Sequence, residues 1–255
     1  MKKPTFLKHE RPLLTVMVQA DNPDRIRELI DASVPEGAEA FGMQLCRMKN
    51  EYRTEGTYRS LFHYAGEMPV YVTNYRHAEN KAKSDDELAR ELLELAECGA
   101  TLCDIMGDLF DPCEGELTVN SDAVNKQMIL IDELHNCGAE VLMSSHVMKF
   151  TPAERVLEIA LEHQRRGADI CKIVTGAEST EQQIENLRII NLLKENLDIP
   201  FLFLSAGQSR IIRRIGGALG CCMYLCVHEY DKLATKAQPL LSEMVAIRDC
   251  IGSAY

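Results

Sequence analysis

The chain has 255 residues, of which 46% are hydrophobic and 26% are charged, with ordinary glycine and proline contents. This composition is typical of one large globular domain and excludes a disordered or fibrous chain. A formal net charge of −11 repels both nucleic acid and anionic membrane surfaces, so we expect neither as a partner.

The first residues are basic but lack the apolar stretch of a signal peptide, and no later segment has the ~18 consecutive apolar residues of a membrane span. We therefore expect a cytoplasmic protein.

A zinc site built from Cys222, Cys226 and His228 is disfavoured because a fourth ligand is missing. No cysteine pair has Cys-x-x-Cys spacing, and most cysteines lie in apolar runs, so they are predicted to be reduced core thiols. Those in strand-like runs are Cys46, Cys103, Cys171, Cys221 and Cys222.

Short apolar or β-branched runs alternate along the chain with longer amphipathic runs, and the alternation repeats eight times. The predicted strands are 13–20, 39–46, 69–75, 101–106, 140–146, 168–174, 200–206 and 219–227. The predicted helices are 23–33, 55–65, 84–98, 121–137, 152–166, 179–196, 208–217 and 238–251. Gly37, Gly99, Gly138 and Gly167 each stand between a helical run and the next strand, where a helix C-cap glycine belongs.

Eight βα units predict an α/β fold closed into a (β/α)8 TIM barrel. We expect a single domain over residues 1–255, with residues 1–12 as an N-terminal extension that either plugs the barrel floor or hangs free. An open doubly wound sheet is the competing architecture. It usually carries a glycine-rich phosphate loop after its first strand, and residues 19–23 contain no glycine.

Lys172 lies inside the apolar run 168–174, and His146 closes the apolar run 141–146. A lone ammonium in a buried strand is costly, and burial favours the neutral amine that attacks ketones to form a Schiff base. Two such residues at the ends of consecutive predicted strands indicate an imine-forming amine with a nearby proton carrier. The alternative is a lysine that snorkels from a strand end and a hydrogen-bonded core histidine.

In a (β/α)8 barrel the active site lies at the carboxyl ends of the strands. The polar residues that end predicted strands are Arg47, Arg76, Asp104, His146, Lys172 and Ser205. Arg47 and Arg76 need anionic partners, which are either protein carboxylates or a substrate acid. The segment 205–214 places backbone N–H groups and three arginines at a helix start and should attract an anion. Within it, Arg210 and Arg214 are spaced to share a helix face.

Several of these segments together resemble the type I 3-dehydroquinate dehydratase family. The matching segments are Ser144-Ser145-His146 with Phe150-Thr151-Pro152, Gly167-Ala168-Asp169-Ile170-Cys171-Lys172-Ile173, and Ser205-x-Gly207-x-Ser209 with Arg214. A weaker resemblance extends over the whole chain. Arg47 falls where the family has Glu-x-Arg, Thr73-Asn74-Tyr75-Arg76 where it has Thr-Phe-Arg, and Gln238 where a late glutamine contacts substrate.

The resemblance implies that Lys172 forms an imine with the C3 ketone of 3-dehydroquinate and that His146 removes a C2 proton and later helps water leave from C1. It also implies that Arg214, Gln238 and the Ser205 loop hold the substrate carboxylate and hydroxyls. No metal or organic cofactor is then required. By the same resemblance we expect a homodimer, for which the helix 179–196 offers an outward surface.

The chain departs from the family pattern where substrate polar groups would be recognised. Leu45 replaces the strand acid expected before Arg47, with Gln44 the nearest polar residue. The Asp-x-Glu expected on the fourth strand is Asp104-Ile105-Met106. Lost buried carboxylates leave arginines or a catalytic base uncompensated unless another group replaces them.

Two further substitutions lie in the loops. The acidic-Gly-Gly expected after the third strand becomes Glu79-Asn80-Lys81, and the serine expected before Gln238 becomes Ala234, beside Thr235. We predict Gln44, Glu79, Arg47 and Arg76 as further substrate contacts. The segment 228–238 after the last strand could close over a bound molecule.

Three hypotheses follow from these patterns. The first is a 3-dehydroquinate dehydratase acting through Lys172 and His146. The second is a divergent Schiff-base lyase or aldolase acting on another small hydroxy-keto carboxylate. The third is a non-catalytic binding barrel that retains Lys172 as a structural remnant.

Overall fold

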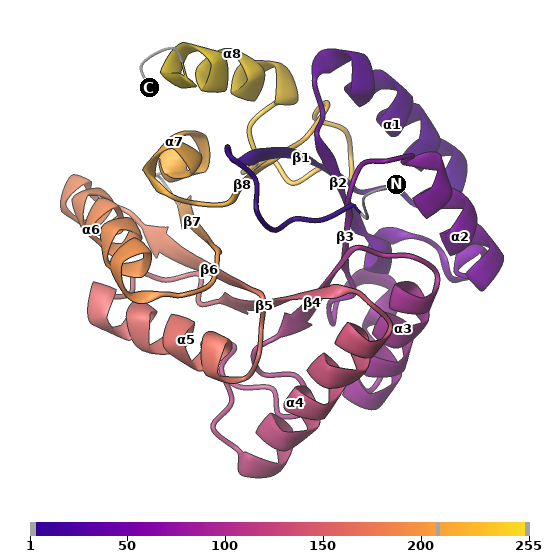
Figure 1. Cartoon of the computed structure of the whole chain (residues 1–255), viewed down its shortest axis with the longest axis horizontal. Helices are drawn as coiled ribbons and strands as arrows, with labels where there is room; N and C mark the ends of the chain where they lie inside the picture. The colour runs from indigo at the N-terminus through magenta and orange to yellow at the C-terminus, as the bar shows by residue number, and fades with distance from the viewer. Residues whose placement is uncertain (1–3, 208–209, 253–255) are drawn as a thin grey trace.

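The computed structural model describes residues 4–207 and 210–252. Its eight parallel strands form one sheet in the order β7-β6-β5-β4-β3-β2-β1-β8. The backbone N–H of Cys222, just before β8, donates to the carbonyl of Phe201 in β7 (2.9 Å), which joins the two ends of the sheet. Figure 1 shows the resulting ring of strands with the helices arranged around it. The predicted single-domain (β/α)8 barrel is confirmed.

The strands and helices lie close to the positions expected from the sequence. The strands are β1 (Leu13–Val18), β2 (Ala40–Gln44), β3 (Val70–Thr73), β4 (Leu102–Met106), β5 (Glu140–His146), β6 (Ile170–Ala177), β7 (Phe201–Gly207) and β8 (Met223–Cys226). The helices are α1 (Pro23–Glu36), α2 (Glu55–Tyr64), α3 (Asp85–Glu97), α4 (Ser121–Asn136), α5 (Ala153–Arg165), α6 (Thr180–Asn196), α7 (Ile212–Leu219) and α8 (Leu241–Gly252). The first two residues of the predicted helix 208–217 lie outside the described residues, and the second of them is Ser209 of the family motif.

Local chemistry explains where these elements begin and end. All four junction glycines adopt the left-handed conformation that terminates a helix, with φ of 107° at Gly37, 109° at Gly99, 81° at Gly138 and 100° at Gly167. Ser84 forms a full capping box with Glu87 at the start of α3. The strands are buried on both faces because helices cover the outside and side chains fill the inside, so their sequences are mainly apolar.

The described part of the N-terminal extension covers one end of the barrel. Phe6 is 2% exposed and packs edge-on against Tyr71 of β3, with ring centroids 6.3 Å apart. The Phe6 backbone N–H donates to Glu140 at the start of β5 (2.8 Å). This is the amino-terminal end of the strands, so the extension plugs the floor and leaves the opposite end open.

None of the helices in the described part of the chain has the length and apolar character that a membrane span requires.

Candidate active site

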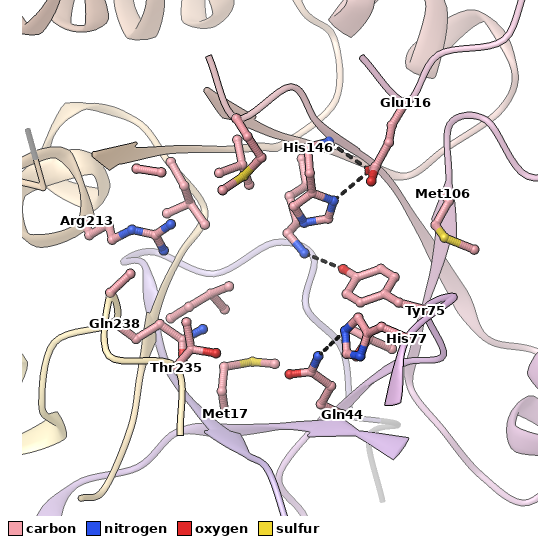
Figure 2. Close-up of a pocket in the computed structure, with 18 of the residues that line it drawn as sticks. Met17, Gln44, Tyr75, His77, Met106, Glu116, His146, Arg213, Thr235 and Gln238 are labelled. Carbon is pink, nitrogen blue, oxygen red and sulfur yellow. Dashed lines mark hydrogen bonds and ion pairs between the residues drawn. The ribbon is translucent and has the colours of Figure 1, made fainter. Parts of the chain in front are cut away.

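Side chains at the carboxyl ends of the strands surround a cavity of about 520 Å³. Figure 2 shows Tyr75, His146 and Glu116 on one wall, with Arg213 and Gln238 across the cavity. The lining residues are Met17, Gln44, Thr73, Tyr75, Arg76, His77, Met106, Glu116, His146, Met148, Lys172, Val174, Leu204, Ala206, Arg213, Leu225, Thr235, Ala237 and Gln238. Lys172 and His146, predicted from the end positions of two strands, therefore face the same space.

Lys172 projects from β6 into the barrel and is 4% exposed. Its Nζ atom lies 3.2 Å from Asp104 Oδ2, 3.0 Å from the Tyr71 hydroxyl and 2.7 Å from the Tyr75 hydroxyl. Ser144, the β5 residue in register with Lys172, donates its hydroxyl to Asp104 Oδ1 (2.6 Å). The lysine is thus neither snorkelling into solvent nor isolated in an apolar core.

Asp104 is the counter-charge of the amine. Burial raises the pKa of this carboxyl, but the Lys172 ammonium and the hydroxyls of Ser144, Tyr71 and Tyr75 outweigh burial, and the net pKa lies below its usual value. The carboxylate is therefore ionised at neutral pH. With Oδ2 lying 3.2 Å from Nζ, it can also accept a proton from the ammonium.

His146 ends β5 and is held by Glu116 from the loop after β4. Glu116 Oε2 lies 2.8 Å from His146 Nδ1 and accepts a hydrogen bond from the His146 backbone N–H at 2.9 Å (Figure 2). Burial raises the pKa of Glu116, but the His146 ring and backbone N–H lower it further, so the net shift is downward. A carboxylate at Nδ1 favours the tautomer that carries its proton there, which leaves Nε2 as a base.

A buried network fixes the loop that carries Glu116. The Glu116 backbone carbonyl accepts a hydrogen bond from the Ser145 hydroxyl (2.6 Å), and the Glu116 backbone is left-handed with φ of 48°. Arg166, 2% exposed, donates to the carbonyls of Gly107 (2.9 Å) and Thr118 (2.6 Å) at the two ends of the same loop. Sequence reasoning missed Glu116. The only signal was its place in a loop after a strand, at the active-site end of the barrel.

Arg76 lines the cavity, but its charge is already compensated by protein carboxylates. Its guanidinium forms a bidentate pair with Asp85 (2.7 and 2.8 Å) and a further pair with Asp108 (2.7 Å). Although burial disfavours its charge, these carboxylates raise the pKa of Arg76 above its usual value. Of the two kinds of anionic partner considered from the sequence, the structure thus provides the protein carboxylates.

Gln44 also lines the cavity and donates its side-chain amide to His77 Nε2 (2.9 Å; Figure 2). Burial first, and then the nearby charge of Arg47, lowers the pKa of His77, so this pair is neutral. Leu45, which stands where the family acid is expected, is 1% exposed and faces the core. The wall around Gln44 therefore offers an amide and an imidazole where the family pattern has a carboxylate.

On α7, the arginine that faces the cavity is Arg213, not Arg214 as expected from the sequence. Arg213 is 7% exposed, lines the cavity and donates from Nε to the Ser205 carbonyl (2.9 Å). Arg214 points toward α8 and pairs with Glu243 (3.0 Å). Successive helix residues are rotated by about 100°, so an assignment one residue off along α7 places the guanidinium on the wrong side.

Arg213 carries a positive charge that is buried beside the cavity. No carboxylate in the described part of the chain lies within ion-pair distance of its guanidinium. Burial, with a smaller contribution from the charge of Arg210, lowers the pKa of Arg213 to about 10. The group remains a cation at neutral pH, and an anion entering the cavity would compensate it.

Three other predicted contacts lie away from the cavity lining. Arg47 is half-buried in the 3-10 turn Leu45–Arg47, and its charge acts on the nearby His77 ring. Ser205 is fully buried, and its hydroxyl accepts from Asn186 (3.1 Å). Glu79 is exposed and accepts from Asn50 (3.3 Å). Strand-end position alone does not decide which way a side chain points.

The segment after β8 contributes Thr235, Ala237 and Gln238 to the cavity lining. Thr235 exchanges hydrogen bonds with Gln19 at the end of β1 (2.9 and 3.3 Å), and its hydroxyl stands beside the alanine that replaces the family serine. Gln238 Oε1 is buried without a hydrogen-bond partner among the described residues. It is therefore an open acceptor at the rim of the cavity.

Across residues 4–207 and 210–252, no group of three or more His, Cys, Asp or Glu side chains is arranged to hold a metal ion. His228, considered as a zinc ligand, pairs with Glu36 (2.9 Å), and the Cys226 thiol donates to the Thr15 carbonyl (3.4 Å). The strand thiols of Cys103 and Cys171 are buried and free, and burial raises their pKa. They are unreactive core residues.

The fold and the cavity define the class as a (β/α)8 barrel in which a buried lysine and a carboxylate-held histidine face one chamber at the carboxyl ends of the strands. A family model for type I 3-dehydroquinase matches residues 14–253. The chain belongs to the type I 3-dehydroquinase family.

Curated relatives align over part of their length. A 3-dehydroquinate dehydratase from Alkaliphilus oremlandii is 35% identical over 92 residues, which are 35% of this chain and 36% of the relative. One from Syntrophotalea carbinolica is 29% identical over 163 residues, 62% of this chain and 60% of the relative. The aligned stretch thus covers less than two thirds of these relatives.

The barrel also resembles solved structures. A 3-dehydroquinate dehydratase from Geobacillus kaustophilus superposes with a TM-score of 0.81 at 16% identity, covering 96% of this chain and 92% of that one. One from Clostridium difficile gives a TM-score of 0.81 at 17% identity, covering 97% and 95%. At these identities the likeness establishes the fold.

Proposed function

We propose that the protein is a 3-dehydroquinate dehydratase that acts through a Schiff base on Lys172. The observation that carries this proposal is the placement of a buried lysine amine and a histidine held by Glu116 on the wall of one cavity. Membership of the type I 3-dehydroquinase family supplies the reaction. The substrate is a small hydroxy-keto carboxylate, and the reaction removes water from it to give a conjugated enone.

The chemistry follows from the two side chains. The Lys172 amine attacks the ketone carbon, water leaves, and a protonated imine forms that withdraws electrons from the adjacent carbon. His146 Nε2 takes a proton from that carbon, and the electron pair moves into an enamine. The enamine expels the hydroxyl one carbon further on, and the imidazolium of His146 returns its proton to make water. Hydrolysis of the imine releases the enone and restores the amine.

Glu116 acts on the histidine rather than on the substrate. Its negative charge at Nδ1 stabilises the imidazolium that forms when Nε2 accepts the proton. The fourth strand has Met106 where the family pattern has a glutamate, and Met106 lines the same cavity. A carboxylate lost from the strand is thus replaced by one from the loop that follows it. The base keeps its counter-charge.

Arg213 and Gln238 are the proposed contacts for the substrate acid. The guanidinium of Arg213 pairs with no carboxylate among residues 4–207 and 210–252, and Gln238 lines the cavity near it (Figure 2). Gln44, which lines the cavity from β2, is the proposed contact for a substrate hydroxyl. Arg76, whose donors are engaged by Asp85 and Asp108, shapes the wall rather than binding an anion.

A second candidate is a Schiff-base lyase or aldolase for another hydroxy-keto acid. The observation that favours it is the composition of the cavity wall, where Met17, Met106 and Met148 stand with the neutral Gln44–His77 pair. Such a wall offers fewer hydrogen bonds to a substrate with several hydroxyls. The same lysine would then serve a less hydroxylated ketone.

Borohydride reduction in the presence of 3-dehydroquinate tests the proposal. We expect an adduct on Lys172 by intact mass and peptide mapping, together with formation of the enone. Lys172→Met should abolish both, whereas His146→Ala should retain the adduct but turn over ~10²-fold or more slowly. Trapping with another keto acid but not with 3-dehydroquinate would favour the second candidate. No adduct with any tested keto acid, together with unchanged binding by Lys172→Met, would favour the non-catalytic binding barrel.

We extend the proposal to a cytosolic homodimer. The acidic composition and the buried reduced thiols support the compartment. Ile184 and Leu187 on the outer face of α6 are 61% and 40% exposed, and they support a subunit contact there. Sedimentation equilibrium of the protein and of Ile184→Lys tests this, since a dimer formed through α6 should dissociate in the variant.

A further inference from the structure

Tyr75 is placed between the two groups that carry the proposed chemistry. Its hydroxyl lies 2.7 Å from Lys172 Nζ and 2.5 Å from Asp104 Oδ2. Its ring meets the His146 ring edge-on, with centroids 5.3 Å apart and an interplanar angle of 82°. Figure 2 shows the Tyr75 ring beside His146, with its hydroxyl turned into the cavity. A ketone bonded to the amine would therefore lie within reach of the Tyr75 hydroxyl.

Imine formation needs proton transfers at the attacking nitrogen and at the ketone oxygen. The oxygen of the ketone must leave as water, so a proton donor has to stand beside the carbon attached to Nζ. Within the described residues, the side chains in hydrogen-bond contact with Nζ are Asp104, Tyr71 and Tyr75. Among these three, Tyr75 lines the cavity, while Asp104 and Tyr71 are buried beneath it.

Tyr75 is suited to pass a proton rather than to hold a charge. Burial of its hydroxyl and the adjacent Asp104 carboxylate raise the pKa of Tyr75 well above its usual value. A long-lived phenolate beside that carboxylate is therefore disfavoured. The hydroxyl can still donate its proton on one side and accept another from Asp104 once that carboxyl has taken up the Lys172 proton, because the two groups are already hydrogen-bonded.

Building on the proposed Schiff-base function, we propose that Tyr75 is a catalytic residue that relays protons between Asp104, the Lys172 nitrogen and the ketone oxygen during imine formation and hydrolysis. The Lys172 ammonium first gives one proton to Asp104, and the neutral amine attacks the ketone carbon. As the N–C bond forms, Tyr75 accepts an N–H proton and donates its own to the developing alkoxide, giving a neutral carbinolamine.

The second half of the relay completes the imine. The carbinolamine C–O bond breaks with its electron pair on oxygen, Tyr75 donates its proton to that oxygen, and water leaves. The proton held by Asp104 moves to Tyr75. The ammonium and the ketone have then become a protonated imine and water, while Tyr75 and Asp104 are back in their starting states. Hydrolysis of the product imine uses the same steps in reverse.

Tyr71 provides a matched control for this proposal. Its hydroxyl also contacts Lys172 Nζ and Asp104 Oδ2, but the residue is fully buried below the cavity and packs on Phe6. Removing either hydroxyl takes one hydrogen bond from the same amine and the same carboxylate. Tyr71 differs in that it does not line the space where the ketone oxygen would lie.

The test is rapid-quench borohydride trapping with 3-dehydroquinate, measuring the rate constant of imine formation on Lys172. Tyr75→Phe should lower this rate constant ~10²-fold, the usual effect of general acid–base catalysis, while Tyr71→Phe should lower it by less than ~10-fold. The Tyr75→Phe defect should persist from pH 6 to pH 9, because a missing relay is not restored by raising the fraction of free amine. A defect that vanishes at high pH would assign Tyr75 to setting the charge of Lys172 and overturn the relay.

The outcomes separate the two proposals. No wild-type adduct overturns the Schiff-base function and the relay together. A wild-type adduct with equal trapping by Tyr75→Phe, or equal defects in both phenylalanine variants, overturns the relay alone. Should Tyr75→Phe fail to fold, the wild-type rate in deuterium oxide serves instead. The relay predicts slower imine formation there, and an unchanged rate contradicts it.

Discussion

Replacing Glu116 with glutamine tests how far a loop carboxylate governs the base. The substitution keeps the size and the acceptor oxygen that binds the His146 backbone N–H, and it removes the charge beside Nδ1. In the wild type that charge stabilises the imidazolium formed during proton abstraction. Glu116→Gln should therefore slow the proton-transfer step and leave imine formation on Lys172 intact.

The magnitude follows from the geometry. The two side chains lie 2.8 Å apart and are 23% and 29% exposed, so solvent screens the pair only in part. A charge-assisted hydrogen bond contributes ~1.5–3 kcal/mol. Since each ~1.4 kcal/mol is a factor of ten in rate, we expect a loss of about 10- to 100-fold. Because glutamine preserves the ring position, the loss should fall mainly on kcat.

The assay follows exchange of the substrate α-proton with solvent deuterium by NMR, in parallel with borohydride trapping. Glu114→Gln is the matched control, since Glu114 lies on the same loop but is 84% exposed and pairs with Lys149 at the surface. Glu116 would have no such effect on the base if Glu116→Gln exchanged the proton as fast as Glu114→Gln, or if trapping and exchange declined together.

Arg213→Gln should raise KM by about 10- to 100-fold through loss of a charged hydrogen bond to the substrate acid, whereas Arg214→Gln, which breaks a surface ion pair worth ~0–1 kcal/mol, should change it little. Steady-state kinetics on both variants decide this, and the reverse ranking would return Arg214 to the site. A third prediction concerns stability, because burial and the charge of Arg166 lower the pKa of His163 to about 3. As the pH falls, the His163 side chain takes up a proton in the unfolded chain, where its pKa is about 6.5, while it stays neutral in the folded protein. The free energy of unfolding should therefore fall by ~2 kcal/mol between pH 6.5 and pH 5. His163→Gln should flatten that slope in urea melts, and an unchanged slope would exclude His163 as its source.

The sequence determined the barrel because each unit carries its own local signals. Apolar runs of strand length, amphipathic runs of helix length and a glycine at each of four junctions specify where elements begin and end. Lys172 and His146 could be predicted for the same reason. His146 ends β5, Lys172 is the one charged residue inside β6, and the parallel strands of a barrel bring the residues toward their carboxyl ends around one space.

The tertiary structure alone decided which side chains complete the site. Glu116 reaches His146, and Tyr75 reaches Lys172, only because the barrel brings separate βα units side by side. The choice of Arg213 over Arg214 depends on the rotation of α7, which a one-residue offset changes by about 100°. Local patterns fix backbone elements through short-range propensity, whereas contacts between loops and neighbouring strands depend on packing that no short stretch of sequence contains.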